Sequence, residues 1–287
     1  MMELHLKIKS AINTFKKFSL SGKLGLILIL LILLMAIFAP WLSPHPHQRS
    51  SGSALIPPDS EHILGTDDLG IDLWAQITNG ARISLLVGFG TALLAAVGGG
   101  VLGIVAAYKG GLIDKILMRL IDIMMVMPDL PVMILLAAFF GPSLFNIILV
   151  LAIFSWIRPA RIVRSQVLML KEQSYIKSAE SYGAKSWYLI RKHFLPEVSP
   201  LLAVSIIRLS SRAIVAEAGL SFLGLGDPTS RSWGLIIHHA LNFQGIYYTP
   251  FWRWWLLYPW LALTILTVSL AFIGRDLERI VDPRLGN

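Results

Sequence analysis

The chain has 287 residues, of which 55% are hydrophobic and 15% charged, with a mean hydropathy of +0.67 and a formal net charge of +8. This composition is too apolar for an ordinary soluble domain and is typical of a protein that crosses a membrane several times. Cysteine is absent, which excludes disulfides, thiolate metal sites and cysteine nucleophiles. Most lysines and arginines lie in short loops beside apolar runs, where they set membrane topology, so the charge does not indicate nucleic-acid binding.

The first apolar run, residues 24–42, follows Lys16, Lys17 and Lys23 as the apolar part of a secretory signal peptide would. It is longer than the apolar core of such a peptide, and it ends at residues 40–44 (PWLSP) without a small-residue cleavage site. We therefore interpret it as a retained first membrane span.

Six apolar runs are each long enough to cross ~30 Å of hydrocarbon at about 1.5 Å per residue. They predict an all-α membrane protein with six transmembrane helices, at residues 24–42, 83–108, 116–140, 143–160, 201–223 and 254–273. We expect residues 1–82 to hold a cytoplasmic tail, the first span and an extracytoplasmic segment. Residues 83–287 would then form a five-helix core.

The loops indicate how this protein is oriented in the membrane. The N-terminal tail and the loop at about 158–200 are rich in lysine and arginine, whereas the segment at 44–80 is acidic. Because positive loops stay on the inner side, we expect both termini and the 158–200 loop to be cytoplasmic in a multi-pass protein of the cell membrane. The segments at 44–80 and 225–252 would then face outward.

Small residues and prolines mark two of the expected spans. Gly99 and Gly103 form a G-x-x-x-G pattern in the second span, which lets another helix approach closely. Pro128 and Pro131 should kink the third span, because proline removes a helical hydrogen bond and clashes with the preceding turn.

The long cytoplasmic loop has the pattern of two short helices. Apolar residues share one face of a helix expected at residues 175–182, and Gly183 fits the left-handed conformation that ends such a helix. A second helix is expected at residues 186–194 and should stop before Pro196. Two short helices at an angle would form a protruding wedge, suitable as a docking surface for another protein.

This loop resembles that of the integral-membrane permease subunits of binding-protein-dependent ABC importers. Their motif reads Glu-Ala-Ala, three residues, Gly, nine residues, Ile-x-Leu-Pro. The spacing from Gly183 to Leu195 and Pro196 is kept, and the Glu-Ala-Ala positions fall on residues 177–179, where only the last alanine is retained. His193 stands where isoleucine is usual.

Further segments narrow the resemblance to the dipeptide, oligopeptide and nickel branch, and within it to the second (C-type) permease of each pair. These segments read HILGTD, GARISL, SFLGLG, SWG and DPRL and lie at residues 62–67, 80–85, 221–226, 232–234 and 282–285. Ile71 departs from an arginine that is common in that branch. The resemblance extends from about Leu20 to Leu285 and implies a type I importer bundle with a coupling-helix loop.

The resemblance implies a non-catalytic transport subunit that forms half of a pathway for di- or oligopeptides; nickel, metal chelates or other small solutes are the alternative. It also implies a second permease, two ATPase subunits and an extracytoplasmic binding protein as partners. No G-x-x-x-x-G-K-[ST] motif occurs, so ATP and Mg²⁺ would bind the ATPases and this chain would hold no cofactor. The residues implied in ATPase coupling are Lys177, Ser178, Ala179, Glu180, Gly183, Ala184, Leu195 and Pro196.

Charges within spans are candidates for function, because burying them in lipid is costly. Asp129 lies between two prolines, and we expect it to line the pathway and to favour cationic or amine groups. Arg208 and Arg212 share one face of the fifth span. Two alternatives stay open for them: pairing with Asp122 or Asp129, or contact with substrate carboxylates. Asp122 could also pair with Arg119, three residues away.

Other kinds of function fit less well. His238 and His239, with the methionines of the third span, could suggest a metal site, but adjacent histidines point in different directions on a helix and methionine is common packing material. A secondary transporter should show inverted repeats, and the sequence contains no convincing repeat. An intramembrane protease would need a serine–histidine or two-aspartate arrangement on facing spans, which the expected spans do not carry.

Overall fold

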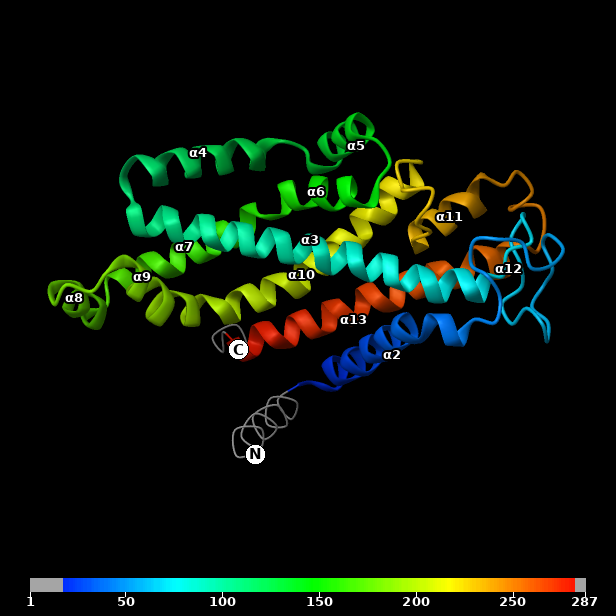
Figure 1. The fold of residues 1–287 in the computed structure, drawn as a ribbon, viewed down its shortest axis with the longest axis horizontal. Coiled ribbons are helices and arrows are strands. Elements are labelled where there is room, and N and C mark those ends of the chain that lie inside the picture. The colour runs from blue at the N-terminus through cyan, green and yellow to red at the C-terminus, as the bar shows by residue number, and fades with distance from the viewer. Residues whose placement is uncertain (1–17, 282–287) are drawn as a thin grey trace. The chain divides into compact units, whose positions relative to one another are not determined.

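The computed structural model describes residues 18–281, and every regular element among them is helical (Figure 1). The lysines that precede residue 18 and the motif at 282–285 lie outside the described residues. The helices, in chain order, are α2 (Leu20–Leu42), α3 (Leu73–Lys109), α4 (Gly111–Val126), α5 (Asp129–Phe140), α6 (Leu144–Ser155), α7 (Ile157–Lys171), α8 (Ser174–Ser181), α9 (Ser186–Leu189), the π-helix η1 (Ile190–Phe194), α10 (Leu195–Phe222), α11 (Trp233–Asn242), α12 (Trp252–Trp255) and α13 (Leu257–Val281).

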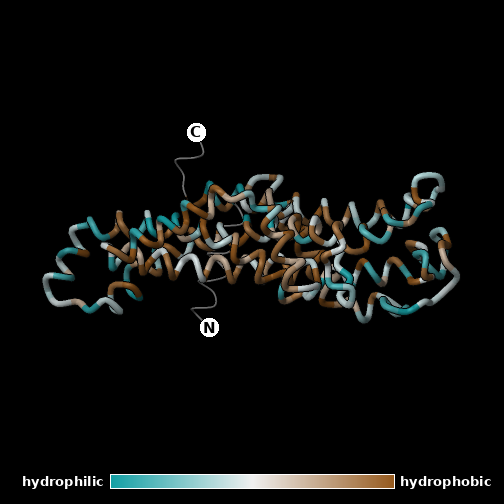
Figure 2. The backbone as a smooth tube through the Cα atoms, turned by 90° about the horizontal axis from the view of Figure 1, so that it is seen from above, coloured by the Kyte–Doolittle hydropathy of each residue, from teal (hydrophilic) through white to brown (hydrophobic). Residues whose placement is uncertain are grey.

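The all-α membrane fold expected from the sequence is confirmed. Four helical stretches are long and apolar enough to cross a membrane: α2, α3, Ser186–Phe222 and Trp252–Val281. Two bent pairs, α4 with α5 and α6 with α7, pass the same test together, so the described residues offer four to six candidate spans. Figure 2 colours the backbone by hydropathy, and hydrophobic residues recur along its helical coils.

The described residues divide into two compact units, one made of residues 18–84 with 231–281 and one made of residues 85–230. The first boundary lies beside residue 82, where the sequence analysis placed one. The functional division expected there stays a prediction.

In the first unit, α2 packs along α13, and a polar contact fixes where α2 begins. Ser19 is the N-cap of α2, and its hydroxyl accepts a hydrogen bond from the Gly22 backbone at 3.1 Å. The backbone N–H and the hydroxyl of Ser19 both donate to the buried carboxylate of Asp276 on α13, at 2.7 Å each. One carboxylate therefore ties the start of α2 to the far end of α13.

The last turn of α2 contains a proline, and an arginine distant in sequence replaces the hydrogen bond that this proline cannot make. Pro40 has no N–H, so the Ala36 carbonyl loses its usual helical donor. Arg82, near the start of α3, donates to that carbonyl through Nε and to the Ile37 carbonyl through a terminal nitrogen at 3.0 Å. The arginine of the GARISL segment thus supplies a hydrogen bond that Pro40 removed.

The segment between α2 and α3 is held by Asp67 of the HILGTD segment. One carboxylate oxygen accepts from the backbone of Leu69 and Ile71, at 2.9 and 2.8 Å. The other accepts from Gln76 at 2.7 Å and from Arg231 at 3.2 Å. Because the carboxylate is almost fully buried, these four hydrogen bonds offset the free-energy cost of removing it from water.

In the second unit, the glycines of α3 permit the close packing predicted from G-x-x-x-G. A Cβ on Gly103 would lie 2.6 Å from the Ala160 carbonyl oxygen, and one on Gly99 would contact the Trp156 carbonyl. Arg164 also binds both carboxylate oxygens of Asp114, the second at 2.6 Å, which joins α7 to the first turn of α4.

The third expected span is not one helix, so residues 116–140 need correction. α4 ends at Val126 and α5 begins at Asp129, and their axes differ by 95°. Met127 is extended, with ψ of 136°, because a residue before proline is pushed out of the α conformation. Pro128 then serves as the N-cap of α5. The prolines therefore break the span where a kink was predicted.

The fourth expected span, residues 143–160, is also divided. α6 and α7 meet at Trp156 with a bend of 41°. α6 alone rises only about 18 Å, which is less than the ~30 Å of hydrocarbon, so this span needs part of α7 to cross.

Candidate functional site

Helix α8 forms as predicted, and Gly183 ends it through a complete Schellman motif. Gly183 has φ of +82°, a conformation that glycine adopts without the steric cost that a Cβ brings. Its N–H donates to the Glu180 carbonyl at 2.9 Å, and the Ala184 N–H donates to the Ala179 carbonyl at 3.0 Å. Ala179, the one alanine of the Glu-Ala-Ala motif that is retained, and Ala184 are thus joined by a hydrogen bond of the cap, and both are half-buried.

The segment that carries α8, α9 and η1 (residues 174–196, called the coupling segment below) is anchored by a hydrophobic cluster. Ile176, Leu189 and Phe194 point inward and are fully buried against residues of α3 and α7. Ala179 and Ala184 pack against the same cluster. Figure 1 shows α8 and α9 at one end of the 85–230 unit. The segment can therefore move as a rigid part together with the helices beneath it.

Lysine and tyrosine side chains reinforce this anchor at the end of α3. Lys171 donates to the carbonyls of Ala107 and Tyr108, both at 3.1 Å, and so satisfies acceptors that the end of α3 leaves open. The Tyr108 hydroxyl donates to Ser186 Oγ at 2.9 Å, which connects α3 to α9.

The second helix of the loop does not stop before Pro196, so that expectation is wrong. Ser186–Phe222 is one continuous helical path in which η1 is a short π-helix and Pro196 sits in the first turn of α10. Proline cannot donate to a carbonyl one turn back and its ring crowds that carbonyl, and a wider π-turn relieves both problems. The Leu195 N–H accordingly donates to the Ile190 carbonyl, five residues back.

The outer face of the coupling segment is exposed and mixes charged with aromatic side chains. Tyr182 is 92% exposed and Trp187 is 70% exposed. Lys177, which stands where the family motif has glutamate, donates to Glu172 at 2.6 Å, and this hydrogen bond lowers the pKa of that carboxyl. Both side chains are largely exposed, so the pair contributes little stability. Ser178 and Glu180 lie on the exposed side of α8.

A cavity of about 210 Å³ lies between α4, α5, α6, α7 and α10, and it contains two of the three predicted pathway residues. Asp129 and Arg212 are both in its lining, whereas Arg208, exposed on α10, is not. The lining residues are Met124, Met125, Asp129, Leu130, Met133, Leu151, Phe154, Ser155, Ile157, Arg158, Leu209, Arg212, Ala213 and Ala216.

Asp129 lies in the lining of this cavity and also close to Arg212. Its carboxylate lies 3.6 Å from the nearest guanidinium nitrogen of Arg212, too far for a direct hydrogen bond. About half of each side chain is exposed, so the pair is weak and each group can exchange its partner for a ligand. Arg119 and Asp122, by contrast, form no ion pair among the described residues, and both are exposed.

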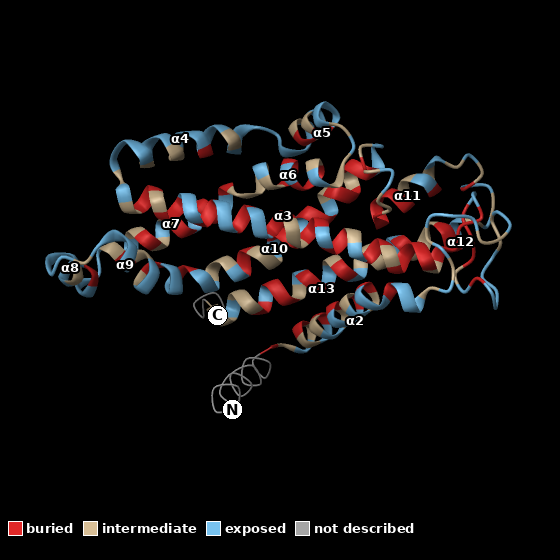
Figure 3. Ribbon diagram, viewed as in Figure 1, coloured by how far each residue is buried: buried red, intermediate tan, exposed pale blue. Residues whose placement is uncertain are grey.

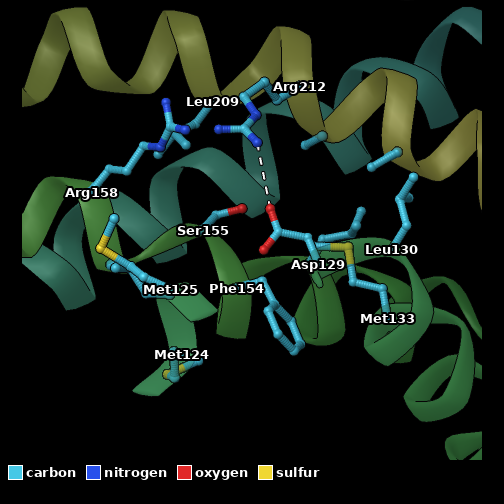
Figure 4. A pocket seen from close by; sticks show the side chains of 14 residues that line it. Met124, Met125, Asp129, Leu130, Met133, Phe154, Ser155, Arg158, Leu209 and Arg212 are labelled. Atoms are coloured by element: carbon cyan, nitrogen blue, oxygen red, sulfur yellow. Dashed lines mark ion pairs between the residues drawn. The ribbon is translucent and has the colours of Figure 1, made fainter. Parts of the chain in front are cut away.

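Sequence reasoning missed Arg158 and Ser155 in this cavity. Figure 4 shows their side chains turned toward the same space as Asp129 and Arg212. In the sequence, Arg158 was one of many loop cations, and nothing in the pattern set it apart. The bend at Trp156, which the sequence did not predict, is what directs it inward. The cavity lining thus contains two guanidinium groups and one carboxylate.

Known protein families match most of the chain. Residues 99–287 match the binding-protein-dependent transport system inner membrane component, and residues 21–58 match the N-terminal TM domain of oligopeptide transport permease C. The chain therefore belongs to the family of inner-membrane components of binding-protein-dependent transport systems, and the resemblance inferred from the loop motif is confirmed.

Individual relatives agree over nearly the whole length. The chain is 39% identical over 263 residues to the dipeptide transport system permease protein DppC of Bacillus subtilis (strain 168), covering 91% of this chain and 81% of the relative. It is 38% identical over 279 residues to the oligopeptide transport system permease protein OppC of the same bacterium, covering 96% and 90%. A probable D,D-dipeptide transport system permease protein of Escherichia coli (strain K12) is 35% identical over 262 residues, covering 91% and 86%.

Proposed function

We propose that this chain is the C-type permease of an ATP-driven importer of di- or oligopeptides, and that it forms half of the translocation pathway. ATP hydrolysis in two partner ATPases would reach the pathway through the coupling segment. A second permease would supply the other half of the pathway, and an extracytoplasmic binding protein would deliver the substrate. We also propose that both termini are cytoplasmic and that nucleotide binds to the ATPases and not to this chain.

One observation carries this proposal: a single helical path contains the second half of the coupling segment and a cavity residue. The path begins at Ser186, within the exposed segment, and continues through Arg212, which lines the cavity. A helix can transmit a displacement along its axis as a rigid element. A push on the segment would therefore reach the cavity through one continuous helical backbone.

The surface of α4 supports the need for a second permease. Within this chain Ile121 is its one buried residue, although Ile116, Ile123 and Val126 are large and apolar (Figure 3). A helix with so much uncovered apolar surface needs lipid or another membrane helix against it.

The charges of the cavity favour a peptide over a bare metal cation. Arg158 and Arg212 against Asp129 leave one positive charge in excess, which attracts a carboxylate and repels a divalent ion. Asp129 is also placed at the first turn of α5, where it can accept a substrate amine. A peptide carries both groups.

The function is tested by uptake through the assembled importer in proteoliposomes. Asp129→Asn should raise the half-saturating concentration of a labelled dipeptide with a free amino terminus by roughly five-fold, since one exposed charge contact contributes about 1 kcal/mol. The same substitution should leave uptake of the N-acetylated dipeptide unchanged. Asp122→Asn, on the exposed side of α4, is the matched control and should behave as the native chain.

Two results would contradict the proposal. Equal effects of Asp129→Asn on both peptides would remove Asp129 from amine recognition. ATP-dependent uptake of nickel or a nickel chelate without uptake of any peptide would replace the peptide substrate by the metal alternative.

A further inference from the structure

Three potential metal ligands converge in the extracytoplasmic segment between α2 and α3. His45, Glu61 and His62 each offer one ligand atom, and these atoms all lie within 4.8 Å of one another. The two imidazole rings are 4.6 Å apart between centroids. Among the described residues this is the one group of three such side chains so close together. It belongs to the first unit and plays no part in the cavity.

Asp72 orients the His62 ring as carboxylates do for metal-binding histidines. His62 Nδ1 lies 2.9 Å from Asp72 Oδ2, and both side chains are about 2% exposed. The other oxygen of Asp72 accepts from the Ala75 backbone at 2.7 Å, so the carboxylate is fixed at the start of α3. A hydrogen bond from Nδ1–H to this carboxylate places the lone pair of the ring on Nε2, where a metal ion can bind it.

Residue 52 lies close to that nitrogen and carries no side chain. A Cβ on residue 52 would lie 2.6 Å from His62 Nε2 and 3.4 Å from both ring carbons beside it, so any side chain there would cover Nε2. Residue 52 is glycine, so no side chain covers Nε2 from this position. Zinc lies about 2.0–2.1 Å from a histidine nitrogen, and a side chain at residue 52 would stand in its way.

A turn built by Asp59 fixes Glu61 next to His62. One carboxylate oxygen of Asp59 accepts from the backbone N–H groups of Glu61 and His62, at 2.9 and 2.5 Å. His45 reaches the same turn, since its Nε2 lies 3.1 Å from the Glu61 carbonyl oxygen.

We propose that His45, His62 and the Glu61 carboxylate bind a divalent transition-metal ion of the zinc type. Two imidazoles and one carboxylate suit such an ion, with water in the fourth position. Tetrahedral ligands are roughly 3.3 Å apart, so the half-buried His45 and the exposed Glu61 must move inward while the buried His62 stays in place. The bound ion would join the end of α2 to the start of α3.

The test uses the complete importer in detergent, stripped with a chelator and titrated with Zn²⁺ against a chromophoric competitor. Native protein should bind about one ion per copy of this chain, and His45→Ala or Glu61→Gln should weaken binding ten-fold or more. His47→Ala is the matched control, because His47 lies two residues from His45 and outside the cluster, and it should bind as the native chain does. Co²⁺ in place of Zn²⁺ should give the visible absorption of a tetrahedral site in native protein and not in His45→Ala.

A thermal readout separates loss of the ion from loss of the fold. Without metal, native protein and the His45→Ala variant should unfold at the same temperature, and Zn²⁺ should raise that temperature only in native protein. Equal Zn²⁺ affinity in native protein, His45→Ala and Glu61→Gln would overturn the proposal, as would the absence of Zn²⁺ binding to native protein. Either result would leave peptide transport untouched, since the cluster lies outside the cavity.

Discussion

Arg82 donates a hydrogen bond to the Ala36 carbonyl, which Pro40 leaves without its helical donor. Arg82→Met should lower the stability of the importer in detergent by about 1–3 kcal/mol, because it leaves a buried carbonyl without a donor. In a Pro40→Ala background the same change should cost less, since the alanine introduced there would supply the missing N–H. Thermal unfolding of the four proteins of this double-mutant cycle measures the difference. Equal costs in both backgrounds would show that Arg82 acts independently of Pro40.

His47 gives the segment between α2 and α3 a dependence on pH. Partial burial, and then the positive charges of Arg231 and Arg82, lower the pKa of His47 below its ordinary value of 6.5. The unfolded segment therefore binds the proton more readily than the folded one, so stability is complete above about pH 6.5 and falls as the pH drops below it. The free energy of opening for residues 43–72, obtained from hydrogen-exchange rates corrected for the intrinsic pH dependence of exchange, should be lower at pH 5.5 than at pH 7.5. His47→Gln should reduce this difference, and an unchanged pH profile would assign it to other groups.

At the scale of elements, the C-terminal cap of α8 allows the effect of backbone strain to be tested separately from an effect on ATPase coupling. Gly183 and Gly141 have nearly the same positive φ, +82° and +81°, and neither would bring a Cβ within 4 Å of another group. Alanine at Gly183 should cost roughly 1 kcal/mol through backbone strain in its αL cap. Gly141 has ψ of 165°, a region that essentially only glycine occupies, so alanine there should cost more through backbone strain. Gly183→Ala should also reduce the number of peptides transported per ATP hydrolysed, because it disturbs the coupling segment, whereas Gly141→Ala should not. Parallel loss of coupling in both variants would contradict a specific role for α8.

The elements also show which features a sequence can predict. The four long apolar helices, the α8 helix and its glycine cap depend on local composition, and these were predicted correctly. The break before Asp129 and the continuation through Pro196 were not, although both sites contain proline. After Val126 the chain turns by 95°. At Pro196 the helix continues, because a π-turn accommodates a residue that has no N–H to donate. Phe194 in η1 is fully buried in the cluster beneath the coupling segment, and such tertiary packing is not visible in the sequence.

At the scale of the molecule, the cavity depends on contacts between residues distant in sequence. Asp129 and Arg212 were candidates because charge is costly in a membrane, but their approach to 3.6 Å requires α5 and α10 to pack together. Arg158 joins them because α7 bends away from α6. Local patterns could therefore suggest pathway residues and could not predict which of them meet.

The unbroken helix from Ser186 to Phe222 has a thermodynamic consequence. Ser186 and Arg212 are separated by about 40 Å along this helix at 1.5 Å per residue. If ATPase binding at one end changes the affinity of the cavity for its ligand, then a ligand in the cavity must change the affinity for the ATPase by the same factor. Ligand binding in the cavity would then change how tightly the coupling segment binds the ATPase, so the same helix would transmit an effect in both directions.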